Sequence, residues 1–163
     1  MSRDSDVEPS VSESIRNLFY DYAHCIDDGR LEDWPDLFVD ACSYRVLPKE
    51  NLDREPPFAI VYLENRNQLR DRVLIIREAL VYSLRYDRRV IGNVRVGAVL
   101  DGLYPAWATY IACTTDVVDG VTKLFSAGKY EARVALTDAG PRFKDLDVIV
   151  DTYSVDRQVA LPL

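Results

Sequence analysis

His24 is the only histidine in this 163-residue sequence, and it stands between two carboxylates that could orient it for acid–base chemistry. In a helix, Asp21 and Asp28 would lie three residues before and four residues after His24, within reach of its imidazole ring. Helical-wheel geometry, however, places His24 opposite the apolar stripe of its helix, so we expect the ring to face solvent or a partner. The pattern therefore favours a surface histidine over a catalytic one.

Three aspartates near the end of the sequence, Asp145, Asp147 and Asp151, form a second group that could do chemistry. In a strand this spacing places their carboxylates on one side, and Leu146 and Val148 on the other. Such a row could serve acid–base chemistry or hold a cation. We favour a solvated or interface-facing side of a sheet, because cation-binding loops place their ligands on turns that contain glycine.

The cysteines are too few and too scattered for a metal centre. Cys25, Cys42 and Cys113 show no CxxC spacing, which argues against structural zinc. With one histidine, the chain alone cannot supply the ligands of a Rieske cluster or of a two-histidine, one-carboxylate iron site. We therefore expect reduced, buried thiols without a disulfide, and no metal-binding residues in this chain.

An arginine-rich segment runs from Arg66 to Arg95, where eight arginines stand against three acidic residues. The whole chain has 20 basic and 27 acidic residues and a formal net charge of −7, which argues against nucleic acid as a partner. A protein partner with acidic groups suits arginine better, because guanidinium groups form bidentate pairs with carboxylates at interfaces. The alternative is that the aliphatic parts of these side chains cover the domain's own core. The candidate subunit-interface residues are Arg66, Arg70, Arg72, Arg77, Arg88 and Arg89.

The first half of the sequence has the periodicity of helices. Ser10 to Glu13 matches a capping box, and the helix that follows should end at Gly29. Residues 34–38 predict a short second helix, and alternation at residues 42–46 predicts a strand. After a loop and a short extended piece at residues 58–63, a third helix begins at Asn65. Its apolar stripe is Leu69, Val73, Ile76, Leu80 and Leu84.

The second half predicts four long antiparallel strands, roughly over residues 90–100, 103–117, 121–136 and 142–153. Helices followed by a curled sheet indicate an α+β fold. We expect one domain over residues 10–163, preceded by a disordered or extended tail over residues 1–9. The apolar runs are too short to span a membrane and the N-terminus is not that of a secretory signal, so a cytoplasmic location is expected.

Four segments resemble the small (beta) subunit of aromatic-ring-hydroxylating Rieske non-haem iron oxygenases, and the likeness runs from about Ser12 to the last residue. They are Asp33-Trp34-Pro35-Asp36-Leu37-Phe38, Cys42-Ser43-Tyr44-Arg45-Val46, Glu64-Asn65-Arg66 with Leu69-Arg70-Asp71-Arg72-Val73, and Ala160-Leu161-Pro162-Leu163. The segment from Pro48 to Arg54 is similar to small subunits of the salicylate, anthranilate and terephthalate group.

This resemblance implies a nuclear-transport-factor-2-like (NTF2-like) cone, in which N-terminal helices pack on a strongly curved, mostly antiparallel sheet. It also implies a structural, non-catalytic subunit that assembles and stabilises iron-bearing alpha subunits in an NADH-dependent oxidoreductase. The Rieske 2Fe–2S cluster and the mononuclear Fe(II) would belong to the alpha subunit, which receives electrons from a reductase, in some systems through a ferredoxin. The expected assembly has three alpha and three beta chains, with a beta trimer inside it, and neither nucleic acid nor membrane as a partner.

Two alternatives use the same cone. One is a free-standing isomerase or dehydratase with Asp36, Tyr44 and His24 as its candidate residues, and the other is a binder of a small apolar ligand. A cone filled by its own side chains would count against both. Trp107, Phe125 and Tyr130 are the side chains expected to fill it.

Overall fold

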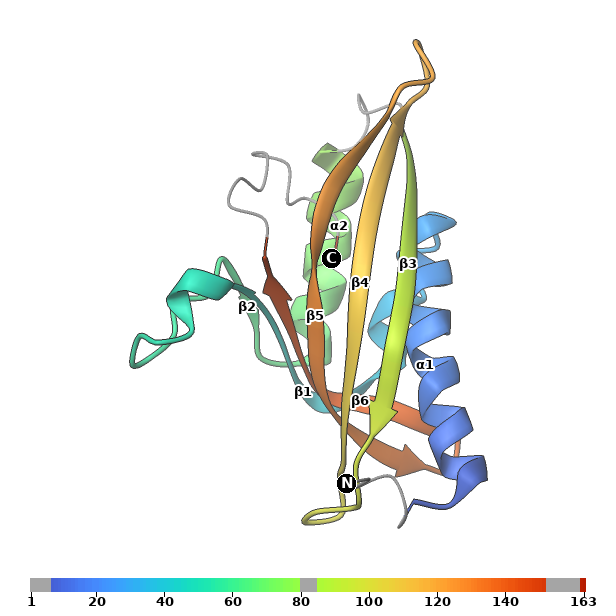
Figure 1. Ribbon diagram of the computed structural model, residues 1–163, viewed down its shortest axis with the longest axis vertical. Coiled ribbons are helices and arrows are strands. Elements are labelled where there is room, and N and C mark those ends of the chain that lie inside the picture. The colour runs from blue at the N-terminus through green and yellow to red at the C-terminus, as the bar shows by residue number, and fades with distance from the viewer. Residues whose placement is uncertain (1–6, 80–84, 152–161) are drawn as a thin grey trace.

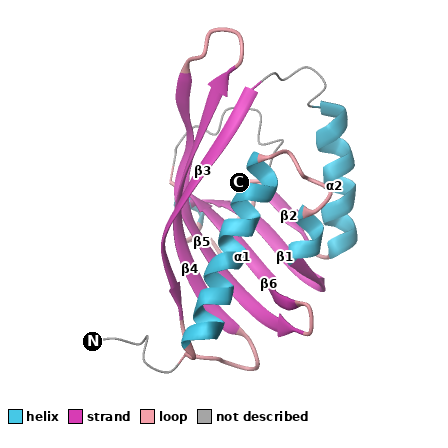
Figure 2. Ribbon diagram, turned by 90° about the vertical axis from the view of Figure 1, so that its right-hand side faces the viewer, coloured by secondary structure: helices cyan, strands magenta, loops and turns pink. Residues whose placement is uncertain are grey.

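The computed structural model describes residues 7–79, 85–151 and 162–163, and their elements form a curved six-stranded sheet with helices on one face only (Figures 1 and 2). The strand order is β2-β1-β6-β5-β4-β3. Figure 2 shows helices α1 and α2 both on the concave side of the sheet, while the described residues place no helix on the opposite side. The α+β fold and the cone-like shape predicted from the sequence are confirmed.

Helix α1 spans Pro9–Asp27 and buries one face against the sheet. It begins earlier than predicted: Pro9 occupies the first turn, where its fixed φ suits a helix, and Ser10 donates a hydrogen bond to the Glu8 carboxylate at 2.6 Å. The predicted capping box at Ser10 is therefore wrong. The helix ends where expected, because Gly29 adopts a left-handed φ of 70° that other residues rarely take. The buried face consists of Ile15, Leu18, Phe19, Tyr22, Ala23, Cys25 and Ile26.

Short elements connect α1 to the second long helix. They are the 3-10 turn η1 at Trp34–Leu37, strand β1 at Phe38–Pro48, the 3-10 turn η2 at Lys49–Asn51 and strand β2 at Val61–Leu63. Helix α2 then spans Arg66–Ala79. The Asn65 side chain caps its start by accepting a hydrogen bond from the Gln68 N–H at 3.0 Å. Leu80 and Leu84, the last residues of the predicted stripe, lie outside the described residues.

The second half of the chain forms the predicted antiparallel meander. Its strands are β3 at Arg85–Val96, β4 at Tyr104–Asp116, β5 at Thr122–Thr137 and β6 at Gly140–Val150. Two features differ from the prediction. Strand β3 begins five residues before Val90, and β1 joins the meander by pairing with β6 in parallel, so the sheet is mixed.

Aromatic rings fill the space between α1 and the sheet. Tyr110 and Tyr130 stack with ring centroids 4.7 Å apart, and Phe19 meets Phe143 edge to face at 5.3 Å. Small residues on the inner side of β4 leave room for these rings; they are Ala106, Ala108 and Ala112. Tyr130 is fully buried and Phe125 packs partly buried against this core, as expected of both.

Trp107 is the exception to the expected filling of the cone. Its side chain is 44% exposed because position 107 falls on the outer, helix-free side of β4. All three cysteines are free; Cys25 and Cys42 are buried, and Cys113 is partly exposed. Among the described residues, no helix combines the length and the apolar character needed to cross a bilayer.

Candidate functional site

Three of the four arginines of α2 bind to the segment that precedes and begins β1. The Arg66 side chain donates hydrogen bonds to the Phe38 carbonyl oxygen and lies 2.9 Å from the Asp40 carboxylate. Arg77 forms a two-bond pair with Glu32, at 2.7 and 2.6 Å, which lowers the pKa of Glu32 to about 2. Arg70 faces Asp36 at 3.7 Å. These contacts hold α2 against residues 32–40 of its own chain.

The two arginines of β3 differ in burial. The Arg89 guanidinium, with 2% of the side chain exposed, lies 2.5 Å from the Asp27 carboxylate, and the Arg89 backbone N–H donates to the same group at 2.7 Å. Arg88 is exposed and donates to the Asp27 carbonyl oxygen at 3.3 Å. Arg72 is half-buried on α2. The six arginines therefore divide between two places, the α2 surface and the junction of α1 with β3.

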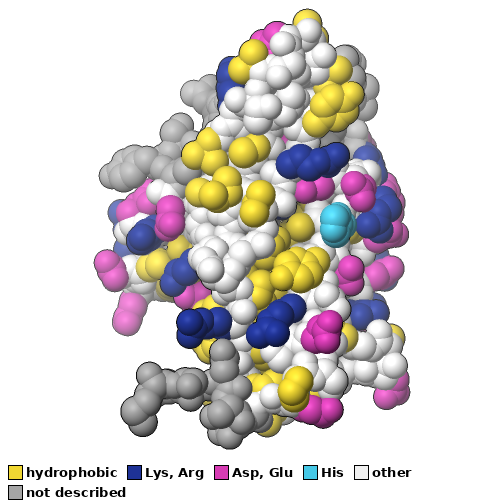
Figure 3. Space-filling view, turned by 45° about the vertical axis from the view of Figure 1, so that its right-hand side comes forward, with side chains coloured by type: hydrophobic (Ala, Val, Ile, Leu, Met, Phe, Trp, Pro, Cys, Tyr) yellow, Lys and Arg dark blue, Asp and Glu magenta, His cyan; other side chains and the backbone are white. Residues whose placement is uncertain are grey.

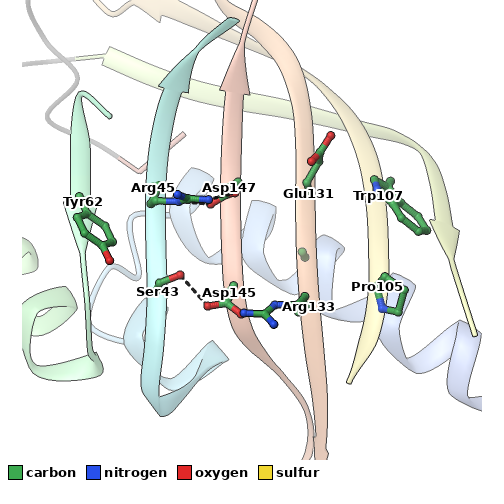
Figure 4. Close-up of a pocket in the computed structure, with 10 residues that line it drawn as sticks. Ser43, Arg45, Tyr62, Pro105, Trp107, Glu131, Arg133, Asp145 and Asp147 are labelled. Atoms are coloured by element: carbon green, nitrogen blue, oxygen red, sulfur yellow. Dashed lines mark hydrogen bonds and ion pairs between the residues drawn. The ribbon is translucent and has the colours of Figure 1, made fainter. Parts of the chain in front are cut away.

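A groove of about 460 Å³ crosses the helix-free side of the sheet (Figure 4). Arg45 on β1 pairs with Asp147 on β6 at 2.7 Å, and Arg133 on β5 pairs with Asp145 at 2.6 Å. Ser43 also donates to Asp145, at 2.7 Å. Two members of the predicted row, Asp145 and Asp147, thus lie on the helix-free side of the sheet, between one arginine of β1 and one of β5. The third, Asp151, follows the end of β6 and lies 3.5 Å from the Lys49 ammonium. The groove is lined by Ser43, Arg45, Tyr62, Pro105, Trp107, Glu131, Ala132, Arg133, Asp145 and Asp147.

Exposed apolar side chains extend this surface toward β3. Val90 is 67% exposed and is paired in register with Ile111, which is 50% exposed. Leu124 on β5 and Tyr86 on β3 are each 61% exposed. We call Tyr86, Val90, Trp107, Ile111 and Leu124 the outer apolar row. Figure 3 shows hydrophobic side chains clustered over one face of the molecule, an arrangement typical of a surface that another protein covers.

Sequence reasoning missed the outer apolar row. The signal was present within single strands, because Tyr86 and Val90, like Trp107 and Ile111, are four residues apart and so share one side of a strand. The strand pairing that brings these residues together could not be read from one sequence. The cross-strand Arg–Asp pairs were missed for the same reason. Only the aspartates of β6 were singled out.

The residues proposed for an isomerase or dehydratase are not brought together. His24 is exposed, as predicted, in a shallow hollow that it shares with Tyr20, Asp28 and Arg88; Figure 3 shows its ring in cyan at the surface. Asp36 has a 68% exposed side chain on η1, whereas Tyr44 is buried in the core. In the part of the chain that the structure describes, no three His, Cys, Asp or Glu side chains are grouped so that they could hold a metal ion.

Comparison with known proteins gives a consistent result. The family model for the ring hydroxylating beta subunit matches residues 22–157. The anthranilate 1,2-dioxygenase small subunit of Burkholderia cepacia is 35% identical over 87% of this chain and 88% of its own length. A beta subunit of the terephthalate 1,2-dioxygenase terminal oxygenase component from Comamonas sp is 28% identical over 87% of this chain and 92% of its own.

Solved structures agree with the fold. The beta subunit assigned to an aromatic-ring-hydroxylating dioxygenase of Novosphingobium aromaticivorans superposes with a TM-score of 0.85 at 34% identity, covering 94% of this chain and 97% of that one. A scytalone dehydratase-type protein of the same organism has a TM-score of 0.67 at 17% identity, covering 88% of each chain, and shows the shared NTF2-like fold alone. With the family model matching most of the sequence, the chain belongs to the beta subunits of aromatic-ring-hydroxylating dioxygenases.

Proposed function

We propose that this chain is a structural, non-catalytic beta subunit that assembles and stabilises the alpha subunits of its oxygenase. The observation that carries the proposal is the outer apolar row. Val90, Ile111 and Leu124 are each at least half exposed on the helix-free side of the sheet. Burying such a row against an alpha subunit removes apolar surface from water. This stabilises the contact by about 25 cal/mol for each Å² of apolar surface buried.

The charge pairs beside the row add specificity to the proposed contact. Arg45 is held by two hydrogen bonds to Asp147, and Arg133 forms an ion pair with Asp145, so both guanidinium groups line the groove and keep N–H groups for a partner. Five of the six candidate arginines remain part of the proposed interface surface: Arg66, Arg70, Arg72, Arg77 and Arg88. The prediction for Arg89 is corrected, because only 2% of its side chain is exposed. Arg70 and Arg77, with side chains 54% and 44% exposed, are the members of the α2 group best placed to reach a partner.

The iron chemistry belongs, in this proposal, to the alpha subunit. That subunit carries the Rieske 2Fe–2S cluster and the mononuclear Fe(II), and electrons reach it from NADH through a reductase. The proposed assembly contains three alpha and three beta chains with a beta trimer inside it, in the cytoplasm. Residues 10–163 act in it as one domain, which the pairing of β1 with β6 supports.

The proposed substrate class is a small aromatic carboxylate. It is supported by two relatives, whose names refer to anthranilate and terephthalate, both of which are aromatic carboxylates. The alpha subunit would insert oxygen into the ring of such a substrate, and this chain would hold that subunit in its active assembly.

Co-expression with the neighbouring reading frames tests the proposal. A tagged beta chain should purify with a red-brown partner that contains iron and shows the visible absorption of a Rieske cluster, and the mass of the complex should fit a hexamer. The complex, supplied with its reductase and NADH, should hydroxylate anthranilate, salicylate or terephthalate. A beta chain that elutes alone and colourless from cells that also produce an alpha subunit would contradict the assembly role.

A further inference from the structure

In the interior of the cone, the buried side chains of Tyr22, Tyr44 and Arg89 bind one short piece of chain, Pro162 and Leu163. We call the surroundings of these two residues the chamber. The Tyr22 O–H donates a hydrogen bond to the Leu163 oxygen, and the Leu163 N–H donates to the Tyr44 hydroxyl at 3.1 Å. The Arg89 guanidinium donates to the Pro162 carbonyl oxygen at 2.5 Å. Because proline has no N–H, these three bonds engage the main-chain polar groups of both residues.

The chamber is built from three elements that are distant in sequence. Tyr22 comes from α1, Tyr44 from β1 and Arg89 from β3, and each of these side chains is at most 2% exposed. Leu163 is fully buried and belongs to the hydrophobic core. Burial raises the pKa of Tyr22 and of Tyr44, so both hydroxyls stay protonated near neutral pH.

The chamber also has more hydrogen-bonding capacity than the two residues use. The Tyr130 hydroxyl and the Arg89 Nε are buried and have no hydrogen-bond partner among the described residues. Tyr130 is fully buried and its ring lies 5.7 Å from that of Tyr22. A buried polar group without a partner costs free energy, so a core that only needed to be filled would use an apolar residue here.

We propose that this chamber is a binding site for a short N-acylated branched amino acid, which Pro162 and Leu163 occupy within the same chain. The ligand class follows from the contacts. A ligand needs a carbonyl oxygen for Arg89, an amide N–H for Tyr44, a second oxygen for Tyr22 and an apolar side chain for the core. Because Asp27 already neutralises the charge of Arg89, the site needs no further negative charge. The oxygen that accepts from Tyr22 can therefore belong to either a carboxylate or an amide.

Removal of the last two residues of this sequence, with the isolated beta chain, tests the site. The shortened chain should melt about 5 °C or more below the intact chain, because a buried leucine and three buried hydrogen bonds are lost. N-acetyl-prolyl-leucine at about 1–10 mM should raise the melting temperature of the shortened chain by several degrees. The intact chain should not respond, because its site is filled.

Three controls make the result specific. The reversed peptide, N-acetyl-leucyl-proline, lacks the amide N–H in the required place and should have no effect. Tyr22→Phe in the shortened chain should weaken binding of N-acetyl-prolyl-leucine about fivefold, because it removes one hydrogen bond to the ligand. N-acetyl-prolyl-leucine amide should stabilise the shortened chain as well as the acid does; a response to the acid alone would overturn the assigned ligand class.

If the shortened chain does not fold alone, the proposal can still be tested. Refolding yield then becomes the measurement, and recovery of the folded chain with N-acetyl-prolyl-leucine, but not with the reversed peptide, supports the site. An unchanged melting temperature on shortening, equal effects of the two peptides, or no recovery with either would overturn it. None of these measurements involves the alpha subunit, so the outcome is independent of the assembly role proposed above.

Discussion

At the scale of single residues, Arg89 and Asp27 form a buried ion pair between β3 and α1. Asp27 is the last residue of α1, and its carboxylate receives both the guanidinium and the backbone N–H of Arg89. One side chain thereby fixes the end of the helix to β3. A charge buried to this degree is tolerated only while its partner is present.

Asp27→Asn should destabilise the chain by about 3 kcal/mol, because it leaves the Arg89 charge buried without a counter-charge. Urea unfolding followed by circular dichroism measures the change. Asp21→Asn is the matched control, since Asp21 lies exposed on the same helix, and it should change stability by less than about 0.5 kcal/mol. Equal effects of the two substitutions would contradict the role assigned to the pair.

The Glu32–Arg77 pair predicts a dependence of stability on pH. The pKa of Glu32 falls from its ordinary value of 4.5 to about 2 in the folded chain, so the pair stabilises the fold above the unfolded pKa. That contribution should be lost as the pH falls from about 4.5 to about 2. Both side chains are largely exposed, so the contribution at pH 7 should be under about 1 kcal/mol.

Glu32→Gln isolates this effect. The difference in unfolding free energy between the wild-type chain and the variant should be largest near neutral pH and should shrink steadily below pH 4.5. Urea titrations at a series of pH values measure it. A difference that stays constant down to pH 3, or that grows as the pH falls, would contradict the assignment.

At the scale of elements, the sheet depends on a close approach between β5 and β6. A Cβ atom added to Gly128 would lie 2.0 Å from the backbone oxygen of Ile149. No side chain fits at that distance, so β5 must carry glycine where it crosses β6. The absence of a side chain allows the two strands to pair despite the strong curl of the sheet.

Gly128→Ala should therefore destabilise the chain by about 1–3 kcal/mol, because the backbone of β6 must shift to admit the methyl group. The unfolding free energy from urea denaturation is the measurement. Gly92→Ala is a suitable control, since its added Cβ would meet only the Thr109 Oγ1 at an ordinary 3.6 Å. The prediction fails if Gly128→Ala is no more destabilising than Gly92→Ala.

Sequence reasoning found most elements but not the way they pair. The apolar stripe of α1, the strand around Tyr44 and the order of the four long strands follow from local periodicity, which one sequence contains. The parallel pairing of β1 with β6 joins residues about 100 positions apart, as in Ser43 with Asp145, and leaves no local pattern. The chamber around Leu163 could not be predicted for the same reason.

At the scale of the whole molecule, the proposed function gives the two sides of the sheet separate tasks. The inner side holds the aromatic core and, through Tyr44 and Arg89, binds Pro162 and Leu163. The outer side combines the outer apolar row with the Arg–Asp pairs of the groove. Substitutions on the outer side should consequently affect assembly with little effect on folding.

Val90→Lys tests this separation. It should weaken binding of the alpha subunit by about 30-fold or more, the effect of losing about 2 kcal/mol at an interface centre, and leave the melting temperature of the isolated chain nearly unchanged. Val118→Lys, the same substitution at an 88% exposed position in the turn after β4, is the control for added charge. Equal binding by both variants would show that the row lies outside the interface.

The parallel contact between β1 and β6 also determines when the chain can fold during its synthesis. Strand β1 lies between β2 and β6, so one of its edges has no partner until residues 140–150 have left the ribosome. Contacts that close such long loops make folding slow, and the nascent chain presents an open strand edge for most of its translation. Rapid overproduction should therefore send most of this chain into inclusion bodies. Slower translation at low temperature should raise the fraction recovered as folded protein.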